Sequence, residues 1–296
     1  MKSTTLRRLC ALSLLSLAVL LWFGHATTRR NGTPKAPGAD RRGGLWGYVR
    51  IRPDQVEQFL DLHFNQCALI SSSGQMRGSG LGAEIDRIPC VIRMNDAPTA
   101  GYEADVGHRT AVRVVSHTSV PRLLKERRRY FREAADTTYV FWGPDRNMRT
   151  DGKGAVFDAL RGIAREYPGA RLYAMTRERV QYCDDVFQNE TGKNRIKSGA
   201  YLSTGFFAMT LAKEMCDSVR VYGMVNADYC RRTNRSAALY HYYDRAAADE
   251  CLVYELHERK RRGGHRFITE KLIYAKWAAR HRMEFRNPSW NLGRGH

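Results

Sequence analysis

Short apolar runs alternate with longer amphipathic segments along the chain beyond residue 50. Runs rich in β-branched and aromatic residues predict strands at 67–71, 90–94, 111–115, 138–142, 171–174 and 219–222. Apolar spacing between them predicts helices from a glycine-rich turn through Ile85, over 155–167, over 204–216 and over 266–277. In the last helix, Ile268, Leu272, Ala275 and Ala279 occur at roughly i, i+4 spacing and are expected to form one apolar face. The alternation predicts an α/β domain with a mostly parallel central sheet flanked by helices.

One continuous apolar run covers residues 9–26, and Lys2, Arg7 and Arg8 precede it. This run is at the short end of the lengths that span a bilayer, and its basic flank belongs on the cytosolic side. It predicts a transmembrane signal anchor with a cytoplasmic tail over 1–8. The alternative is a cleaved signal peptide, because small residues occur at Gly24 and Ala26. Residues 27–50 then predict a short stem, and residues 51–296 a folded lumenal domain.

Glycosylation sequons and cysteines support the lumenal assignment. The sequons place acceptor asparagines at Asn31, Asn189 and Asn234. Six cysteines follow the anchor, an even number that permits disulfides in an oxidising compartment: Cys67, Cys90, Cys183, Cys216, Cys230 and Cys251. The sequence has no Cys-x-x-Cys pair and no Asp-x-Asp pair, so we expect no metal site.

The charge balance narrows the class of partner. The chain has 296 residues, with 49 Lys and Arg against 30 Asp and Glu, a formal net charge of +19. Such an excess favours anionic partners such as nucleic acid, acidic lipid, phosphates or carboxylates. The basic runs 127–129 and 259–262 are scattered through a lumenal domain, so we do not expect nucleic acid to be the partner. A hydrophobic content of 43% excludes a wholly disordered chain.

Two turns rich in small residues are candidate anion sites. The first, 71–83, follows a predicted strand, and its segment Gly78-Ser-Gly80-Leu-Gly-Ala83 matches a dinucleotide fingerprint. A Rossmann-type nicotinamide-dependent oxidoreductase is therefore an alternative interpretation. The second turn, 201–205, opens a helix. Its hydroxyl groups either cap that helix or hold a phosphate or carboxylate.

Two histidines lie in distinctive surroundings. His241 belongs to the polar-aromatic cluster 240–244, and His265 follows a glycine pair at the start of a helix. A histidine placed behind flexible glycines can act as a general base on a mobile loop. Either histidine can also be an ordinary surface group.

Four segments, in the expected order, resemble the sialyl motifs of animal sialyltransferases. Residues 67–119 look like the large motif, 201–223 like the small motif, 241–244 like the third and 265–270 like the very small motif. The sequence at 93–98, 190–194 and 265–271 is most similar to that of the N-acetylgalactosaminide α2,6-sialyltransferases, and among them to the short-stemmed type III and IV members.

The resemblance implies a function and a location. It implies a variant Rossmann-like (GT-A-like) fold and an inverting, metal-independent transferase that uses CMP-sialic acid and no cofactor. The implied acceptor is the 6-hydroxyl of GalNAc in sialylated Galβ1,3GalNAc glycans of glycoproteins or gangliosides. The implied location is the Golgi membrane, as a single-pass type II protein with a lumenal catalytic domain.

The resemblance also assigns residues. His265 matches the catalytic base and His241 the histidine that contacts the donor phosphate. The residues implied to bind the donor are Ser72, Ser73, Asn95, Tyr201, Ser203, Thr204 and Gly205. Cys67 and Cys216 match the disulfide that joins the large and small motifs, and Cys230 and Cys251, which bracket the third motif, are a candidate pair. Many relatives have Asn where this chain has Ser72, and close relatives often have Trp in place of Phe206 and a further Cys in place of Phe64. Because that cysteine is absent here, the partners of Cys90 and Cys183 stay open.

Overall fold

The computed structural model describes residues 44–53 and 58–292. The expected tail, the anchor at 9–26 and the sequon at Asn31 lie outside these residues. No helix in the described part of the chain has both the length and the apolar character needed to cross a bilayer.

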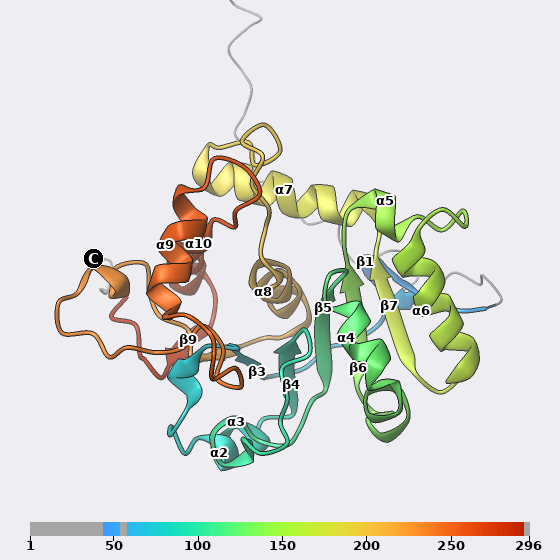
Figure 1. Ribbon diagram of the computed structural model, residues 1–296, viewed down its shortest axis with the longest axis horizontal. Helices are drawn as coiled ribbons and strands as arrows, with labels where there is room; N and C mark the ends of the chain where they lie inside the picture. The colour runs from blue at the N-terminus through green and yellow to red at the C-terminus, as the bar shows by residue number, and fades with distance from the viewer. Residues whose placement is uncertain (1–43, 54–57, 293–296) are drawn as a thin grey trace, which may run out of the picture. The chain divides into compact units, whose positions relative to one another are not determined.

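A mixed sheet of nine strands organises the described residues, in the order β2-β1-β7-β6-β5-β4-β3-β8-β9 (Figure 1). Neighbouring strands from β7 to β9 are parallel, whereas β1 is antiparallel to both β7 and β2. The strands are β1 (Leu45–Arg50), β2 (Phe59–Leu60), β3 (Cys67–Ile70), β4 (Cys90–Met94), β5 (Val112–Ser116), β6 (Thr138–Trp142), β7 (Arg171–Met175), β8 (Val219–Tyr222) and β9 (Met283–Arg286). The predicted, mostly parallel α/β architecture is confirmed.

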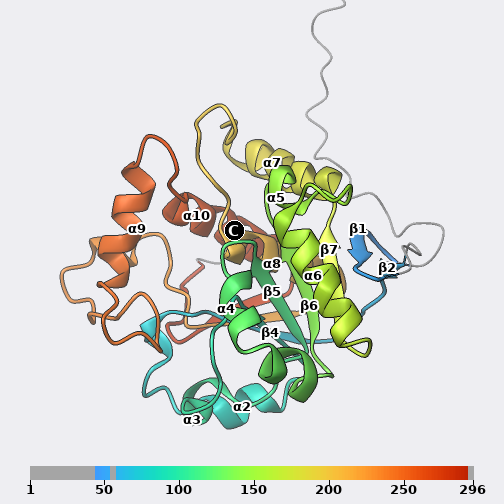
Figure 2. The same cartoon turned by 45° about the vertical axis from the view of Figure 1, so that its right-hand side comes forward.

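Helices cover both faces of this sheet (Figure 2). The α-helices are α2 (Gly82–Asp86), α3 (Glu103–Val106), α4 (Val120–Lys125), α5 (Asp145–Met148), α6 (Ala155–Glu166), α7 (Arg177–Thr191), α8 (Thr204–Met215), α9 (Glu250–Arg259) and α10 (Phe267–Arg280). Shorter turns are η1 (Gly74–Met76), the π-helical η2 (Arg128–Glu133) and η3 (Tyr229–Arg231).

Alternating side chains of the central strands build separate cores on the two faces. On β5, Val112 and Val114 pack in the core shared with α7, α8 and α10, whereas Val115 packs with α4 and α6. On β6, Val140 and Phe141 divide in the same way. Both faces of each central strand are therefore buried, which explains why these strands read as continuous apolar runs.

The folded domain begins before the predicted boundary at residue 51. β1 occupies residues assigned to the stem, and Tyr48 in this strand is fully buried beneath Arg179 of α7. Gly47 has a φ of +77°, and a Cβ there would lie 2.6 Å from the Cβ of Arg179. The glycine and arginine content that suggests a stem therefore serves close packing in this segment.

The apolar face predicted for α10 is only partly buried, because Ile268 and Ala275 pack against the cores but Ala279 is exposed. Leu272 is 52% exposed, whereas Ile273, Tyr274 and Trp277 are buried. Two charged residues, Glu270 and Lys271, are buried with them. A pattern of apolar residues alone misses this face because polar groups with functional neighbours occupy part of it.

Two disulfides form as the sequence suggests. Cys67, at the start of β3, is bonded to Cys216, which follows α8, with a Cα–Cα distance of 6.0 Å. Cys230 is bonded to Cys251 at the start of α9. Cys90 and Cys183 are free and buried. In the described residues, Cys67, Cys90 and Cys216 group closely enough to share a metal ion, but two of these three form the first disulfide.

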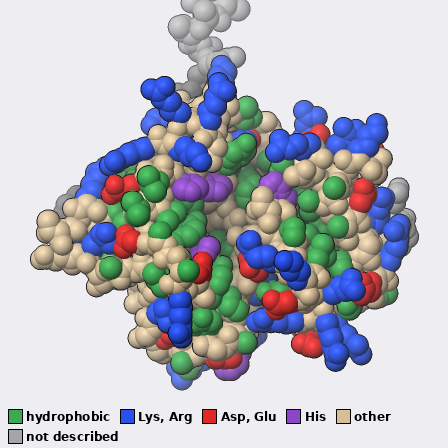
Figure 3. All heavy atoms as spheres, viewed as in Figure 1, with side chains coloured by type: hydrophobic (Ala, Val, Ile, Leu, Met, Phe, Trp, Pro, Cys, Tyr) green, Lys and Arg blue, Asp and Glu red, His purple; other side chains and the backbone are tan. Residues whose placement is uncertain are grey.

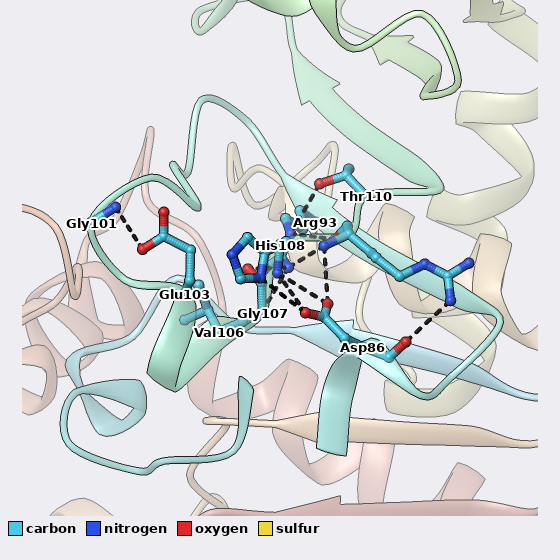
Figure 4. A network of polar contacts seen from close by, with 9 residues as sticks. Asp86, Arg93, Gly101, Glu103, Val106, Gly107, His108 and Thr110 are labelled. Carbon is cyan, nitrogen blue, oxygen red and sulfur yellow. Dashed lines mark hydrogen bonds and ion pairs between the residues drawn. The ribbon is translucent and has the colours of Figure 1, made fainter. Parts of the chain in front are cut away.

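A buried arginine secures the connection between β4 and β5 (Figure 4). Arg93, 1% exposed, donates hydrogen bonds to the carbonyl oxygens of Val106, Gly107 and Arg109. Asp86 accepts from the backbone N–H groups of His108 and Arg109, and these bonds lower the pKa of its carboxyl group. The end of β4, which leads directly to Asn95, is thereby anchored.

Candidate active site

A cavity of about 610 Å³ opens where the parallel strands β3, β4, β5 and β6 end. Ligands bind beyond the carboxyl ends of strands in open α/β sheets, so this position is expected for a functional site. All the residues assigned to donor binding or catalysis line it: Ser72, Ser73, Asn95, Tyr201, Ser203, Thr204, Gly205, His241 and His265. Figure 3 shows histidine side chains gathered around a hollow on this face.

One side of the cavity consists of residues 71–73 and 202–205, which we call the serine wall. Ser73 caps η1 by accepting from the N–H of Gln75, and its hydroxyl donates to Glu250 at 2.5 Å. Gln75 also donates to Glu250. The Ser73 hydroxyl hydrogen is therefore already used within the protein.

Ser203 is held in the same way in the second bend. Its hydroxyl accepts from the N–H of Phe206, which caps α8, and donates to Glu270. The Ser203 N–H donates to the other oxygen of Glu270 at 2.8 Å. This turn therefore caps α8 and also lines the cavity. The hydroxyl group of Ser203, which forms the cap, already has its hydrogen-bond partners within the protein.

The carboxyl groups beneath the two bends share one buried cation. The ammonium group of Lys271 lies 3.6 Å from the centre of the Tyr254 ring. Burial raises the pKa of Glu270 to about 7 and lowers the pKa of Lys271 to about 8. Burial also raises the pKa of Glu250, against the hydrogen bonds that Ser73 and Gln75 donate to it. These groups connect α9 and α10 to both bends.

Ser72 and Thr204 differ from Ser73 and Ser203, whose hydroxyl groups already donate to glutamates. The Ser72 hydroxyl forms no hydrogen bond with another residue in the described part of the chain, and Thr204 Oγ1 has only a long contact of 3.5 Å to Asn95. The N–H groups of Thr204 and Gly205, in the first turn of α8, likewise have no acceptor among residues 44–53 and 58–292. This part of the serine wall presents free donors and the positive end of a helix to the cavity.

Asn95 is fixed at the end of β4 in a left-handed conformation, with a φ of 50°. Its N–H donates to Val114, and its side-chain oxygen accepts from the N–H of Ser116 at 3.0 Å. Arg113 donates to its carbonyl oxygen at 2.8 Å. The side-chain amide of Asn95 therefore has a set orientation at the cavity floor.

His265 is fixed by the backbone of the second bend. The Tyr201 N–H donates to Gly264, and Nδ1 of His265 lies 3.0 Å from the carbonyl oxygen of Tyr201. A carbonyl oxygen only accepts, so Nδ1 carries the hydrogen and Nε2 of the neutral ring carries the lone pair. The Gly263 N–H donates to Gly199. These bonds fix the ring and the backbone of His265 in the structure.

Burial lowers the pKa of the two candidate histidines, His241 and His265. It lowers the pKa of His265, and the nearby His257 lowers it further, while the hydrogen bond to Tyr201 acts in the opposite direction. His257 stacks on His265 with ring centres 5.5 Å apart. Burial also lowers the pKa of His241, against the charges of Asp96 and Asp244. The Tyr242 N–H donates to the Ser72 carbonyl oxygen at 2.8 Å, which ties the His241 segment to the first bend.

The cavity also has residues that sequence reasoning did not single out. Glu250, Glu270 and Lys271 lie beneath the serine wall. At the ends of β5 and β6, His117, Trp142, Gly143 and Arg146 line the cavity, and we call them the ring wall. The available signal for His117 and Trp142 is that each ends or directly follows a predicted strand. For Glu250, which lies far along the chain from Ser73, no pattern in the sequence indicates the contact.

The glycine fingerprint serves a structural purpose. The N–H groups of Gly78 and Gly80 donate to the carboxylate of Asp105 at 2.8 and 2.9 Å. Gly82 packs against α3, where a Cβ would lie 1.9 Å from the carbonyl oxygen of Glu103. None of these glycines lines the cavity. The feature that suggested a nicotinamide-dependent oxidoreductase therefore does not form a pyrophosphate cradle.

Comparison with known proteins agrees with the site. The profile of glycosyltransferase family 29 (sialyltransferase) matches residues 48–281. The rat alpha-N-acetylgalactosaminide alpha-2,6-sialyltransferase 3 is 51% identical over 247 residues, which are 83% of this chain and 80% of the relative. A human alpha-N-acetyl-neuraminyl-2,3-beta-galactosyl-1,3-N-acetyl-galactosaminide alpha-2,6-sialyltransferase is 51% identical over 224 residues, 76% of this chain and 74% of its own.

Among solved structures, the crystal structure of a mammalian sialyltransferase is 21% identical, with a TM-score of 0.48, over 75% of this chain and 68% of its own. The family match covers residues 48–281, a range that contains the serine wall, and the identity of about half extends over most of the chain. The relatives give no support to an oxidoreductase. The chain is a glycosyltransferase, and it belongs to family 29, the sialyltransferases.

Proposed function

We propose that this enzyme transfers sialic acid from CMP-sialic acid to the 6-hydroxyl of GalNAc in sialylated Galβ1,3GalNAc glycans, with His265 as general base. The observation that carries the proposal is the hydrogen bond from Nδ1 of His265 to Tyr201, which leaves the basic Nε2 free in the cavity that also holds Ser72, Asn95 and Thr204. The names of two relatives support the choice of acceptor: both describe α2,6 transfer to N-acetylgalactosaminide, and the human relative is named for an acceptor that carries neuraminyl-2,3-galactose.

The serine wall would hold the CMP group. The free N–H groups of Thr204 and Gly205 and the hydroxyl of Ser72 suit a phosphate, because donors aimed at a developing negative charge stabilise the transition state. His241 precedes Tyr242, whose N–H donates to the Ser72 carbonyl oxygen, and would add a further donor. Ser73 and Ser203 would act by positioning these groups, because their own hydroxyl hydrogens are directed to Glu250 and Glu270.

The reaction would be a single displacement. Nε2 of His265 takes the proton of the acceptor hydroxyl as its oxygen bonds to the anomeric carbon of the sialyl group. The bond between that carbon and the phosphate oxygen breaks on the opposite face, and CMP leaves as an anion. The configuration is therefore inverted, and the charge that develops on the phosphate faces the N-terminus of α8.

We further propose a single-pass type II protein of the Golgi membrane with occupied sequons, no resident metal and no nucleic-acid partner. The side chains of Asn189 and Asn234 are exposed, as glycan attachment requires. The acceptor is carried by a glycoprotein or a ganglioside.

The test uses the full chain with CMP-sialic acid and a sialylated Galβ1,3GalNAc acceptor, with and without a metal chelator. We expect CMP release together with a product that carries a new α2,6 linkage on GalNAc, at equal rates in both conditions. Transfer to another position, or dependence on added divalent metal, would contradict the proposal.

A further inference from the structure

The ring wall holds buried polar atoms that lack partners. Nδ1 of His117 and Nε1 of Trp142 are both buried, and neither has a hydrogen-bond partner among the described residues. The two rings are stacked, with centres 6.3 Å apart and an angle of 23° between their planes. Both side chains line the cavity, and an unpaired buried polar group destabilises a protein by about 1–3 kcal/mol, so a ligand that turns either ring enough to pair with its nitrogen would be favoured.

The same wall carries a free cation. Arg146, in α5, forms no ion pair or hydrogen bond with any residue in the described ranges, whereas two other arginines of the cavity are neutralised. Arg122 pairs with Asp96 at 2.7 Å, and Arg195 pairs with Asp184. Arg146 is therefore the arginine of this cavity whose guanidinium is available to a ligand. A planar guanidinium matches a carboxylate through two parallel hydrogen bonds.

The backbone is shaped so that these groups stay close together. The His117 N–H donates to the carbonyl oxygen of Trp142 at 2.8 Å. A Cβ at Gly143 would lie 2.7 Å from the Cβ of His117, so only glycine permits this approach. Trp142 also packs on Phe207 of α8, with ring centres 4.2 Å apart. These contacts fix the backbone of the ring wall at the ends of β5 and β6.

We infer that Arg146, His117 and Trp142 form the subsite for the sialic acid that the acceptor already carries, an inference that rests on the proposed function. A sialyl group offers a carboxylate to Arg146, hydroxyl and amide oxygens to the ring nitrogens, and an apolar face to Trp142. Trp142 ends a strand three places from β3, which is roughly 14 Å along the sheet edge at about 4.8 Å per strand. That separation suits an acceptor reaching across the cavity better than the phosphate of a donor held at Ser72.

The test compares Arg146→Ala, Arg146→Lys and Arg149→Ala. Arg149 is exposed, lies three residues away and is not part of the cavity, so its variant controls for the change in net charge. Calorimetric titration uses the disaccharide N-acetylneuraminyl-α2,3-galactose, and kinetics use sialylated and asialo Galβ1,3GalNAc. We expect Arg146→Ala to weaken disaccharide binding and raise KM for the sialylated acceptor by about tenfold. The asialo acceptor, the KM for the donor and acceptor-independent donor hydrolysis should not change.

Arg146→Lys should keep part of the affinity, and Arg149→Ala should match the wild type. A higher donor KM in Arg146→Ala would assign the site to the sialyl group of the donor and overturn the inference. So would an equal loss with both acceptors, unchanged binding, or no binding by the wild type. If the wild type binds the disaccharide but transfers nothing, the proposed function fails while the subsite stands.

Discussion

The two walls of the cavity differ in how completely their polar groups are satisfied. In the serine wall, Ser73 and Ser203 each both accept from a backbone N–H and donate to a buried glutamate. In the ring wall, the ring nitrogens of His117 and Trp142 have no partner in the described residues. One wall is therefore built in advance for a ligand, and the other holds groups that a ligand must complete. We therefore expect substitutions in the serine wall to change the stability of the protein together with its affinity for the donor. Substitutions in the ring wall should change the choice of acceptor, through contacts that form only in the complex.

The largest expected loss of stability comes from removing the disulfide behind the serine wall. Cys67 and Cys216 are 149 residues apart, and the loop-entropy model gives such a bridge about 5 kcal/mol of stability. We expect Cys216→Ala to lower the free energy of unfolding by up to this amount, measured by urea denaturation. Cys251→Ala is the matched control, with about 3 kcal/mol for a separation of 21 residues. Equal midpoints for Cys216→Ala and the wild type would show that the bridge does not support this wall.

A second test separates the committed and free serines. Ser203→Ala removes a helix cap and a hydrogen bond to buried Glu270, so it should destabilise the protein by about 1–3 kcal/mol. Ser72→Ala should change stability by less than about 0.5 kcal/mol and raise the donor KM. Urea denaturation and donor kinetics check both variants. The reverse pattern would contradict the division of roles within the serine wall.

In the ring wall, we expect a substitution to change the KM for the acceptor more than the stability of the protein. Trp142→Phe keeps an aromatic ring against Phe207 and removes the unpaired N–H, so stability should stay within about 0.5 kcal/mol or rise. The KM for the sialylated acceptor should rise several-fold. A loss of about 1 kcal/mol or more would mean that the indole N–H already has a partner.

The smallest expected effect concerns pH. Burial lowers the pKa of His265 below its ordinary value of about 6.5, so the neutral, basic ring persists into mild acid. We expect the acidic limb of kcat/KM to have its midpoint below pH 6.5. The free energy of unfolding should also fall in acid. The His265 ring has the higher pKa in the unfolded protein and binds a proton more readily there, so acid favours unfolding. An acidic limb above pH 6.5 would show that another group controls it.

The sequence predicts the central strands because their two buried faces produce apolar runs. It does not predict β1, whose glycine and arginine content resembles a linker until Arg179 is placed over Tyr48. The nine assigned site residues do meet in one cavity. Their roles could not be separated from sequence, because the hydrogen bonds of Ser73 and Ser203 go to α9 and α10, far along the chain. Arg146 and Trp142 stand outside the four motifs, and only the structure shows that Arg146 has no ion pair within the described ranges whereas Arg122 and Arg195 do.

The central claim is that a fixed imidazole at position 265 deprotonates the acceptor in a cavity whose other groups hold CMP. The most direct measurement compares turnover and CMP affinity in His265→Ala, with His257→Ala as a control for the stacked neighbour. The account predicts a fall in kcat of about 10²-fold or more, an unchanged Kd for CMP and a much smaller effect in the control. Turnover near that of the wild type in His265→Ala would contradict it.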